Sequence, residues 1–358
     1  MKKVAVLMSG GVDSSVAAYI LSKNFDIVGI TLKLWNCGQK DIDSSKQLCC
    51  SSKDIYDAKA VCVDLGIKHY VIDFSDQFKK YIIDKFCDKY LNGFTPNPCV
   101  WCNEIIKFGV LFEKLKIELG VDYIASGHYA RIVRSNDMFY IAKAKDESKD
   151  QSYFLSRVNP KILPYIIFPL GDLLKSEVRK IAKEINLKVA EKKESFDLCF
   201  VLDNYRSIIR TKNCTLQRGK ILDYKTKKFL GYHNGYFNYT IGQRKGLMLK
   251  GAGMRYYVVD IDSKNNIVYV GSEDILYKNS LVAENCVFYE NIEELKNKNL
   301  YGKIRYKSNL AKCFLEKIED DRVVVVFEEP QRAITKGQYL VIYDIYGRVL
   351  LNGEIVNF

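Results

Sequence analysis

Long apolar runs are missing from this sequence of 358 residues, although apolar residues make up 48% of it. A helix that crosses a bilayer needs about 20 consecutive apolar residues, so no membrane span is expected. The apolar stretch Val4–Met8 near the start is too short for the core of a signal peptide and runs directly into a Gly/Ser turn. We therefore expect a cytoplasmic protein without a targeting segment.

Internal repeats and low-complexity linkers are also absent. A chain of this length is expected to form two or three packed modules. Its eleven cysteines are odd in number and irregular in spacing, so reduced thiols in the cytosol are expected in place of a disulfide scaffold. The net charge of +12 suits a polyanion such as tRNA, although a lysine-rich composition gives the same charge without such a partner.

Hydrophobic patterning divides the chain into an α/β part and a β-rich part. From Val4 to about Tyr123, short apolar strands alternate with amphipathic helices, which predicts a parallel sheet covered by helices. A helical, charged stretch between about Pro160 and Glu191 indicates a connecting module. From about Arg218 onward, short β-rich runs separated by Gly and Asn predict a small barrel or sandwich.

A glycine-rich loop, Ser9–Ser15 with the sequence SGGVDSS, joins the first strand to the first helix. Its glycines let the backbone approach an anion, and the helix N-terminus supplies N–H donors, so the loop is expected to hold a pyrophosphate group. It lacks the Gly-Lys-Ser/Thr ending of a Walker A loop, which disfavours γ-phosphate hydrolysis. The loop resembles the PP-loop of ATP pyrophosphatases, which adenylate a substrate, and Asp13 would then help to organise Mg²⁺. A plain strand-to-helix turn is the alternative.

Two segments offer the thiol that an adenylated carbon needs if it is to receive sulfur. In Thr95–Asn103, TPNPCVWCN, two prolines stiffen a loop that would present Cys102 near a helix start and lower its pKa. In Ser195–Val201, SFDLCFV, Cys199 lies in an apolar run, where a cysteine taken alone is more often a core residue than a catalyst.

Eight motifs follow one another along essentially the whole chain. They are SGGVDSS, TPNPCxxCN, SGHYAR (Ser126–Arg131), KDQSYFL (Lys149–Leu155), FPLG (Phe168–Gly171), the Cys199 segment, GxHxGxxxYTIGQRKGL (Gly231–Leu247) and FEEPQRAxTxGQ (Phe327–Gln338). In this order they resemble the tRNA 2-thiouridylase family called MnmA.

The resemblance implies three modules, a PP-loop domain, a central tRNA-binding region and a C-terminal β-barrel, and a helical connecting part is expected after the first. Residues 1–160 would form a PP-loop ATP pyrophosphatase domain with a parallel sheet like that of the adenine nucleotide alpha hydrolases. Residues 161–217 would form a helical connecting part that carries the second catalytic cysteine. Residues 218–275 would form a central tRNA-binding module, and residues 276–358 a C-terminal β-barrel.

The resemblance also implies a reaction, in which ATP adenylates O2 of the wobble uridine in tRNAs for lysine, glutamate and glutamine. A persulfide on Cys199 would attack C2, and Cys102 would release the sulfur by forming a disulfide with Cys199, while AMP and pyrophosphate leave. Contacts to ATP are implied for Leu7, Met8, Ser9, Gly10, Gly11, Val12, Asp13, Ser14, Leu32 and Gly127. Contacts to the target base are implied for Asn97, Pro98 and Cys99, and contacts to the rest of the tRNA for His128, Lys149, Asp150, Gln151, Arg305, Tyr306 and Gln338.

Residue chemistry supports these tRNA contacts unevenly. The amide of Gln151 suits base edges and the guanidinium of Arg305 suits a phosphate, whereas His128 and Gln338 could equally be ordinary loop residues.

The CxxC pair departs from the family pattern, because many members have Asp where this chain has Cys99. Together with Cys199, the pair Cys99 and Cys102 could hold an iron–sulfur cluster or zinc, or Cys99 could replace the aspartate without any metal.

Two further stretches contain residues that the motifs do not explain. Phe196-Asp197-Leu198 stands where the family commonly has a smaller run, which we expect to affect the rate more than the reaction type. Cys49, Cys50 and Cys62 have no accompanying histidine and are assigned no role.

Two other function classes stay open: a PP-loop ligase or synthetase, and a non-catalytic tRNA-binding protein. A nitrogen acceptor needs no redox cysteine pair, and a decayed protein needs no intact loop, so SGGVDSS together with both cysteines favours the thiolase. The sequence has no pyridoxal-binding signature with which to extract sulfur from free cysteine. The expected partners are therefore tRNA and a cysteine desulfurase or sulfur-relay protein.

Overall fold

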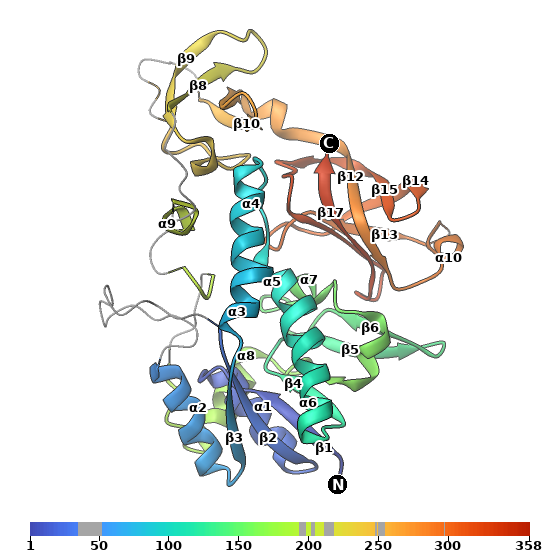
Figure 1. Ribbon diagram of the computed structural model, residues 1–358. Coiled ribbons are helices and arrows are strands. Elements are labelled where there is room, and N and C mark those ends of the chain that lie inside the picture. Colours follow the sequence, from blue (N-terminus) through green and yellow to red (C-terminus); the bar gives the residue numbers. More distant parts are fainter. Residues whose placement is uncertain are drawn as a thin grey trace. The chain divides into compact units, whose positions relative to one another are not determined.

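The structure is a computed structural model that describes residues 1–34, 52–192, 198–201, 205–210, 218–247, 249, 255–296 and 298–358 (Figure 1). The chain divides into two compact units. Unit 1 comprises Met1–Ile83, Pro98–Leu202 and Tyr346–Val349, and unit 2 comprises Asp84–Asn97, Asp203–Ile345 and Leu350–Phe358. No helix among the described residues is long and apolar enough to span a bilayer.

Unit 1 is built on a five-stranded sheet with the order β3-β2-β1-β4-β7. All neighbouring strands are parallel, and Leu7 lies opposite both Ile30 and Ser126. The strands are β1 (Lys3–Leu7), β2 (Asp26–Lys33), β3 (Lys68–Asp73), β4 (Tyr123–Ser126) and β7 (Ile166–Ile167). The parallel sheet expected from the sequence is confirmed, and the carboxyl ends of β1 and β4 meet at the edge where such sheets bind ligands.

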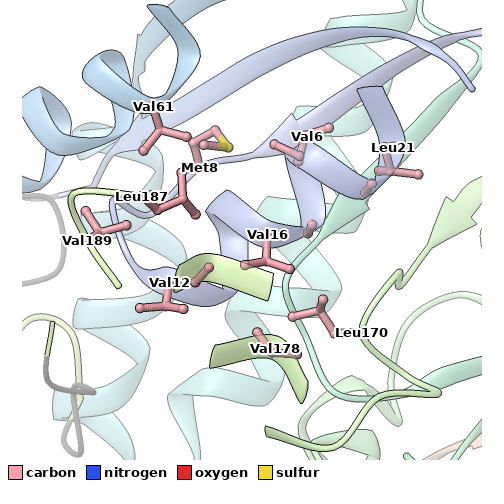
Figure 2. Packing of buried hydrophobic residues seen from close by; sticks show 14 of the residues in the cluster. Val6, Met8, Val12, Val16, Leu21, Val61, Leu170, Val178, Leu187 and Val189 are labelled. Carbon is pink, nitrogen blue, oxygen red and sulfur yellow. The ribbon is translucent and has the colours of Figure 1, made fainter. Parts of the chain in front are cut away.

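Three helices of unit 1 share a core with this sheet: α1 (Val12–Ser22), α2 (Ser52–Asp64) and α8 (Lys175–Glu184). Val6 of β1, Val16 of α1 and Val178 of α8 are buried in one cluster (Figure 2). Since α1 contacts the sheet and also α8, the apolar core fixes the position of its N-terminus and of the loop before it.

The cysteine-bearing part of unit 1 begins with α5 (Pro98–Trp101), which continues as the π-helix η2 (Cys102–Val110). π-turns inside helices frequently mark functional sites. The other elements of unit 1 are α3 (Ser75–Phe78), the π-helix η1 (Lys79–Asp84), α6 (Leu111–Leu119), the hairpin of β5 (Arg131–Ser135) and β6 (Met138–Ala142), α7 (Ser152–Leu155) and the 3-10 helix η3 (Pro160–Tyr165).

Unit 2 contains a closed barrel with the strand order β12-β15-β14-β13-β16-β17. Along β15, Val323, Val325 and Phe327 are buried at alternate positions, as expected of a strand with one face toward the barrel interior. The strands are β12 (Tyr277–Phe288), β13 (Leu300–Lys303), β14 (Ala311–Glu319), β15 (Arg322–Arg332), β16 (Tyr339–Tyr343) and β17 (Val349–Asn357). Of the two arrangements left open by the sequence, the barrel is the one found.

A four-stranded sheet with the order β10-β11-β8-β9 precedes the barrel in unit 2. Its strands are β8 (Arg218–Asp223), β9 (Phe229–Asn234), β10 (Tyr257–Asp262) and β11 (Ile267–Gly271). The helices of unit 2 are α4 (Lys85–Leu91), α9 (Tyr205–Arg210), α10 (Ile292–Lys296) and the 3-10 helices η4 (Tyr236–Asn238) and η5 (Glu273–Leu276).

Candidate nucleotide and thiol site

The glycine-rich loop lies between β1 and α1, at the carboxyl edge of the sheet. Gly10 has a φ of +69°, and a Cβ added there would lie 2.3 Å from the backbone oxygen of Asp54, so the position requires glycine. Ser14 Oγ accepts a hydrogen bond from the Ser9 backbone N–H at 3.2 Å and donates one to the Gly11 carbonyl at 3.1 Å. These contacts hold the loop in a tight turn.

The N-terminus of α1 opens into this loop. Its N-cap residue is Gly11, which has no side chain with which to cap the helix. The first N–H groups of a helix need acceptors from outside it, and together with the helix dipole they favour an anion. Gly127, at the end of β4, packs so tightly on this turn that an added Cβ would lie 2.7 Å from the backbone of Asp13 and Ser14.

Asp13, in the first turn of α1, is bound by two side chains that the sequence did not single out. Lys175 Nζ donates to both carboxylate oxygens at 2.7 and 2.8 Å, and Tyr129 Oη donates to Oδ1 at 2.9 Å. The Lys175 side chain is 11% exposed and that of Asp13 32% exposed. The pair is 162 positions apart in sequence, so only the packing of α8 on α1 could reveal it.

Leu32, an expected ATP contact, is a buried residue near the end of β2. The strand edge around it is fixed by Thr31, whose Oγ1 donates to the Met8 carbonyl at 2.9 Å and lies 2.8 Å from His69 Nε2. Burial lowers the pKa of His69, and the nearby Lys59 adds to this effect. The expected nucleotide residues of β1, the loop, α1, β2 and Gly127 thus lie along one edge of the sheet.

His128 follows Gly127 and packs among aromatic rings. Its Nδ1 lies 2.7 Å from Ser126 Oγ, and its ring centroid lies 6.1 Å from that of Phe108 and 6.0 Å from that of Phe168. Burial, followed by the positive charge of Lys107, holds the pKa of His128 well below its ordinary value. The imidazole is therefore neutral at pH 7, so any contact with tRNA from this side chain would be a hydrogen bond or stacking and not an ion pair.

The turn that contains Lys149, Asp150 and Gln151 is held by its own polar atoms. The buried Asp150 accepts from the backbone N–H groups of Ala144 and Ser152 at 3.0 and 3.2 Å and from Ser152 Oγ at 2.8 Å. Gln151 Oε1 accepts from the Tyr129 N–H at 2.9 Å. Asp150 and Gln151 therefore have structural roles within unit 1, and their contacts with tRNA stay predictions.

The three expected cysteines all belong to unit 1. Cys99 lies in α5, Cys102 is a buried residue at the start of η2, and Cys199 is half-buried. Phe200 has its ring centroid 5.7 Å from that of Phe78 in α3, and α3 contacts η2. The segment that carries Cys199 therefore lies close to the helix that begins with Cys102.

The first turn of η2 is pinned to the chain around α7. Asn103 Nδ2 donates to the Phe154 carbonyl at 3.0 Å, and Arg157 Nε donates to Glu104 Oε2 at 2.9 Å. The first contact joins TPNPCxxCN to the KDQSYFL motif, and the second joins residues just after these two motifs. They hold the backbone that follows Cys102 in place.

A metal site needs a group of suitable side chains. Within the described residues, which include Cys99, Cys102 and Cys199, no group of three or more His, Cys, Asp or Glu is arranged to hold a metal ion. The CxxC pair and Cys199 therefore do not fit a zinc ion or an iron–sulfur cluster as they stand. Phe196 and Asp197 of the departing run, and also Cys49 and Cys50, lie outside the described residues.

The remaining expected contacts lie in unit 2. Gln338 Nε2 donates to the Thr95 carbonyl at 2.8 Å, and the Thr95 N–H donates to the Lys336 carbonyl at 2.8 Å, so these contacts fasten the start of the TPNP segment, just before the buried Asn97. Arg305 and Tyr306 follow β13, where Arg305 Nη2 donates to the Arg332 carbonyl at 3.4 Å. Gln338 is thus brought together with the TPNP segment.

The glycine-rich loop on a parallel sheet, followed by two β modules, defines a HUP-type α/β domain joined to a mixed sheet and a barrel. Three family models match in the same order. Residues 2–203 match the model described as "tRNA methyl transferase HUP domain", residues 211–272 "tRNA methyl transferase PRC-barrel domain" and residues 278–356 "Aminomethyltransferase beta-barrel domain".

Full-length relatives identify the particular family. The tRNA-specific 2-thiouridylase MnmA of Clostridium acetobutylicum is 42% identical, with 99% of both chains covered. The protein named MnmA 2 of Thermoanaerobacter pseudethanolicus is 45% identical over 99% of this chain and 97% of its own, and MnmA of Clostridium botulinum (strain Alaska E43 / Type E3) is 41% identical over 99% and 98%. The chain therefore belongs to the MnmA family of tRNA-specific 2-thiouridylases, which confirms the resemblance and the sulfurtransferase class expected from the sequence.

Proposed function

We propose that this protein replaces O2 of the wobble uridine of tRNAs for lysine, glutamate and glutamine with sulfur, at the expense of ATP. One observation carries the proposal: the glycine-rich loop with the half-buried Lys175 belongs to the same compact unit as Cys102 and Cys199. An adenylating site and a sulfur-bearing thiol are the two things that the reaction requires. A ligase in which a nitrogen nucleophile displaces AMP from the adenylate does not need a sulfur-bearing thiol.

The nucleotide would bind with its phosphates at the N-terminus of α1. The donors there are the first N–H groups of the helix and the ammonium of Lys175, and this set fits a polyphosphate. Mg²⁺ accompanies ATP in such sites and neutralises charge on the phosphates. Asp13 is the carboxylate suited to that ion, and Lys175 would then turn from Asp13 to the phosphates.

The chemistry balances without any bound metal cluster. O2 of the uridine attacks the α-phosphate, and pyrophosphate leaves. The terminal sulfur of a Cys199 persulfide attacks C2, AMP leaves, and the Cys102 thiolate attacks Cys199 Sγ, which breaks the sulfur–sulfur bond. The sulfur stays on C2, and the disulfide between Cys102 and Cys199 is reduced by a thiol reductant before the next turnover.

Recognition of the tRNA and supply of the sulfur involve other molecules. The target base would meet Asn97, Pro98 and Cys99, and the net charge of +12 favours the polyanion at long range. Further contacts are proposed for His128, Lys149, Asp150, Gln151, Arg305, Tyr306 and Gln338. A cysteine desulfurase or sulfur-relay protein would transfer sulfur to Cys199 to form the persulfide. Because the substrate is tRNA, the reaction would take place in the cytoplasm.

The test is sulfur incorporation into unthiolated tRNA, read as retardation in a mercury-containing gel. Protein purified without oxygen is supplied with ATP, Mg²⁺, cysteine and a desulfurase, and wild type is compared with Cys199→Ser. We expect a retarded band that requires ATP and disappears in the variant. If wild type gives no band with any sulfur supply, the thiolase proposal fails, and an adenylate acceptor other than tRNA has to be sought.

A further inference from the structure

A cluster of mostly half-buried charges joins the glycine-rich loop to Lys192, which precedes Cys199 in sequence. Lys192 Nζ donates to the Gly10 carbonyl at 2.9 Å, to Asp54 Oδ1 at 2.7 Å and to Asp57 Oδ2 at 2.6 Å. All three charged side chains are at most 20% exposed. Lys192 precedes Cys199 by seven positions, so one ammonium ties three distant parts of unit 1 together.

Each partner of Lys192 is itself held in place. Gly10 is the loop residue with a φ of +69°, and it packs against the backbone oxygen of Asp54 at the start of α2. The Gly10 carbonyl cannot move away without disturbing the turn that faces the phosphates. Lys192 therefore holds the loop backbone through the Gly10 carbonyl, in addition to pairing with the two aspartates.

The other end of the same segment is also anchored. Phe200 follows Cys199, and its ring packs edge-to-face on that of Phe78. Cys199 therefore lies between an electrostatic anchor at Lys192 and an apolar anchor at Phe200. The anchor at Lys192 contacts the glycine-rich loop directly, through the hydrogen bond to the Gly10 carbonyl.

We propose that Lys192 is a positioning residue that aligns the sulfur of Cys199 with the nucleotide held by the Gly10 loop. The ammonium touches neither nucleotide nor tRNA in this role, and it acts by fixing the distance between the two reacting parts. This inference rests on the function proposed above for Cys199. Misplacement of a reacting group by about 1 Å can cost roughly 100-fold in rate, so loss of the anchor would lower sulfur transfer strongly while ATP still binds.

The decisive variant must remove the anchor without leaving two unpaired buried carboxylates, which would destabilise the fold. The triple variant Lys192→Gln, Asp54→Asn, Asp57→Asn makes the cluster neutral. We expect it to bind ATP and accept a persulfide on Cys199 within about threefold of wild type, whereas single-turnover sulfur transfer to tRNA falls by about 100-fold. The matched control is Lys188→Gln, which removes a lysine whose side chain is 75% exposed, and it should transfer sulfur at the wild-type rate.

A second variant covers the case in which the triple variant does not fold. Lys192→Arg keeps the positive charge, but a planar guanidinium cannot offer one nitrogen to three acceptors, so transfer is expected to fall about tenfold with ATP affinity unchanged. Wild-type transfer by either folded variant would overturn the proposal. A loss of ATP affinity as large as the loss of transfer would also overturn it, because Lys192 would then act on nucleotide binding.

Failure of the proposed function itself can be told apart from failure of this inference. If wild type transfers no sulfur to tRNA, the anchor is judged by hydrogen exchange of the peptide that carries Cys199. We expect faster exchange there in Lys192→Arg than in wild type, with unchanged exchange in the peptides of β1 and β4. Equal exchange in both proteins would show that Lys192 does not hold the segment.

Discussion

The loop edge of unit 1 and the barrel of unit 2 are stabilised in opposite ways. At the loop, buried or half-buried charges are paired by residues far apart in sequence: Asp13 with Lys175 and Asp54 with Lys192, at separations of 162 and 138 positions. In the barrel, apolar side chains such as Val323 and Val325 alternate along strands and fill the interior. The first arrangement concentrates charge where a charged ligand is expected, and the second relies mainly on apolar contacts.

This contrast predicts that changes at the loop edge alter chemistry, whereas changes in the barrel alter stability. Buried charge pairs are often no more stabilising than apolar packing of the same volume. Their presence at the loop is therefore better explained by the ligand than by the fold.

The largest effect is expected for Cys199→Ser, since a hydroxyl cannot carry a persulfide sulfur. Thiolation of tRNA should fall by about 1,000-fold or more, measured as initial rate with saturating ATP. The control Cys286→Ser, in β12 of the barrel, should keep the wild-type rate. A Cys199→Ser protein with a tenth of the wild-type rate would break the assignment of the persulfide.

The next effect tests the barrel. Leu351→Ala in β17 removes a fully buried side chain and should lower the free energy of unfolding by about 2–5 kcal/mol, read from denaturant titration. ATP affinity of the folded protein should stay within about twofold of wild type. Phe314→Ala in β14 is the control, because that ring is 52% exposed and its loss should cost less than about 0.5 kcal/mol.

Lys175→Met tests the loop edge. It removes the ammonium from both oxygens of Asp13 and from the expected phosphate site, so the KM for ATP should rise by roughly 10- to 100-fold, a cost of about 1.4–2.8 kcal/mol. Lys180→Met, on the exposed side of α8, should leave this KM unchanged. An equal KM in Lys175→Met and wild type would contradict a phosphate role for Lys175.

The smallest effect concerns pH. Burial lowers the pKa of all three histidines in the chain, His69, His128 and His233. Below pH 6.5, the ordinary pKa of histidine, the unfolded state binds more protons than the folded state. The free energy of unfolding should therefore fall as the pH drops below about 6.5, and above that pH it should not depend on these groups. Urea midpoints of wild type and His69→Gln at several values between pH 5.5 and 7.5 measure this, and each histidine contributes at most about 1.4 kcal/mol per pH unit. A variant whose midpoint depends on pH as steeply as that of wild type would refute the contribution of His69.

Much of the fold follows from local patterns. The alternation of apolar strands and helices predicted the parallel sheet, and SGGVDSS predicted the loop at the end of β1, because the strand period and the need for glycine at positive φ are properties of short segments. The β-rich texture after Arg218 predicted strands but left barrel and sandwich open. Closure of a barrel depends on which strands pair over long sequence separations, and the local sequence of a strand does not specify its pairing partner.

The sequence by itself determined the family and the order of the modules, and it predicted the residues that bear the chemistry, since each of these is carried by motifs of contiguous residues. Only the tertiary structure decided that Tyr129 and Lys175 hold Asp13, that Lys192 holds Gly10, and that Gln338 fastens Thr95. It also assigned Asp150 and Gln151 to internal hydrogen bonds of unit 1. The physical reason is that the residue type of a lysine or an amide does not specify its partner, which depends on how separate elements pack together in the folded chain.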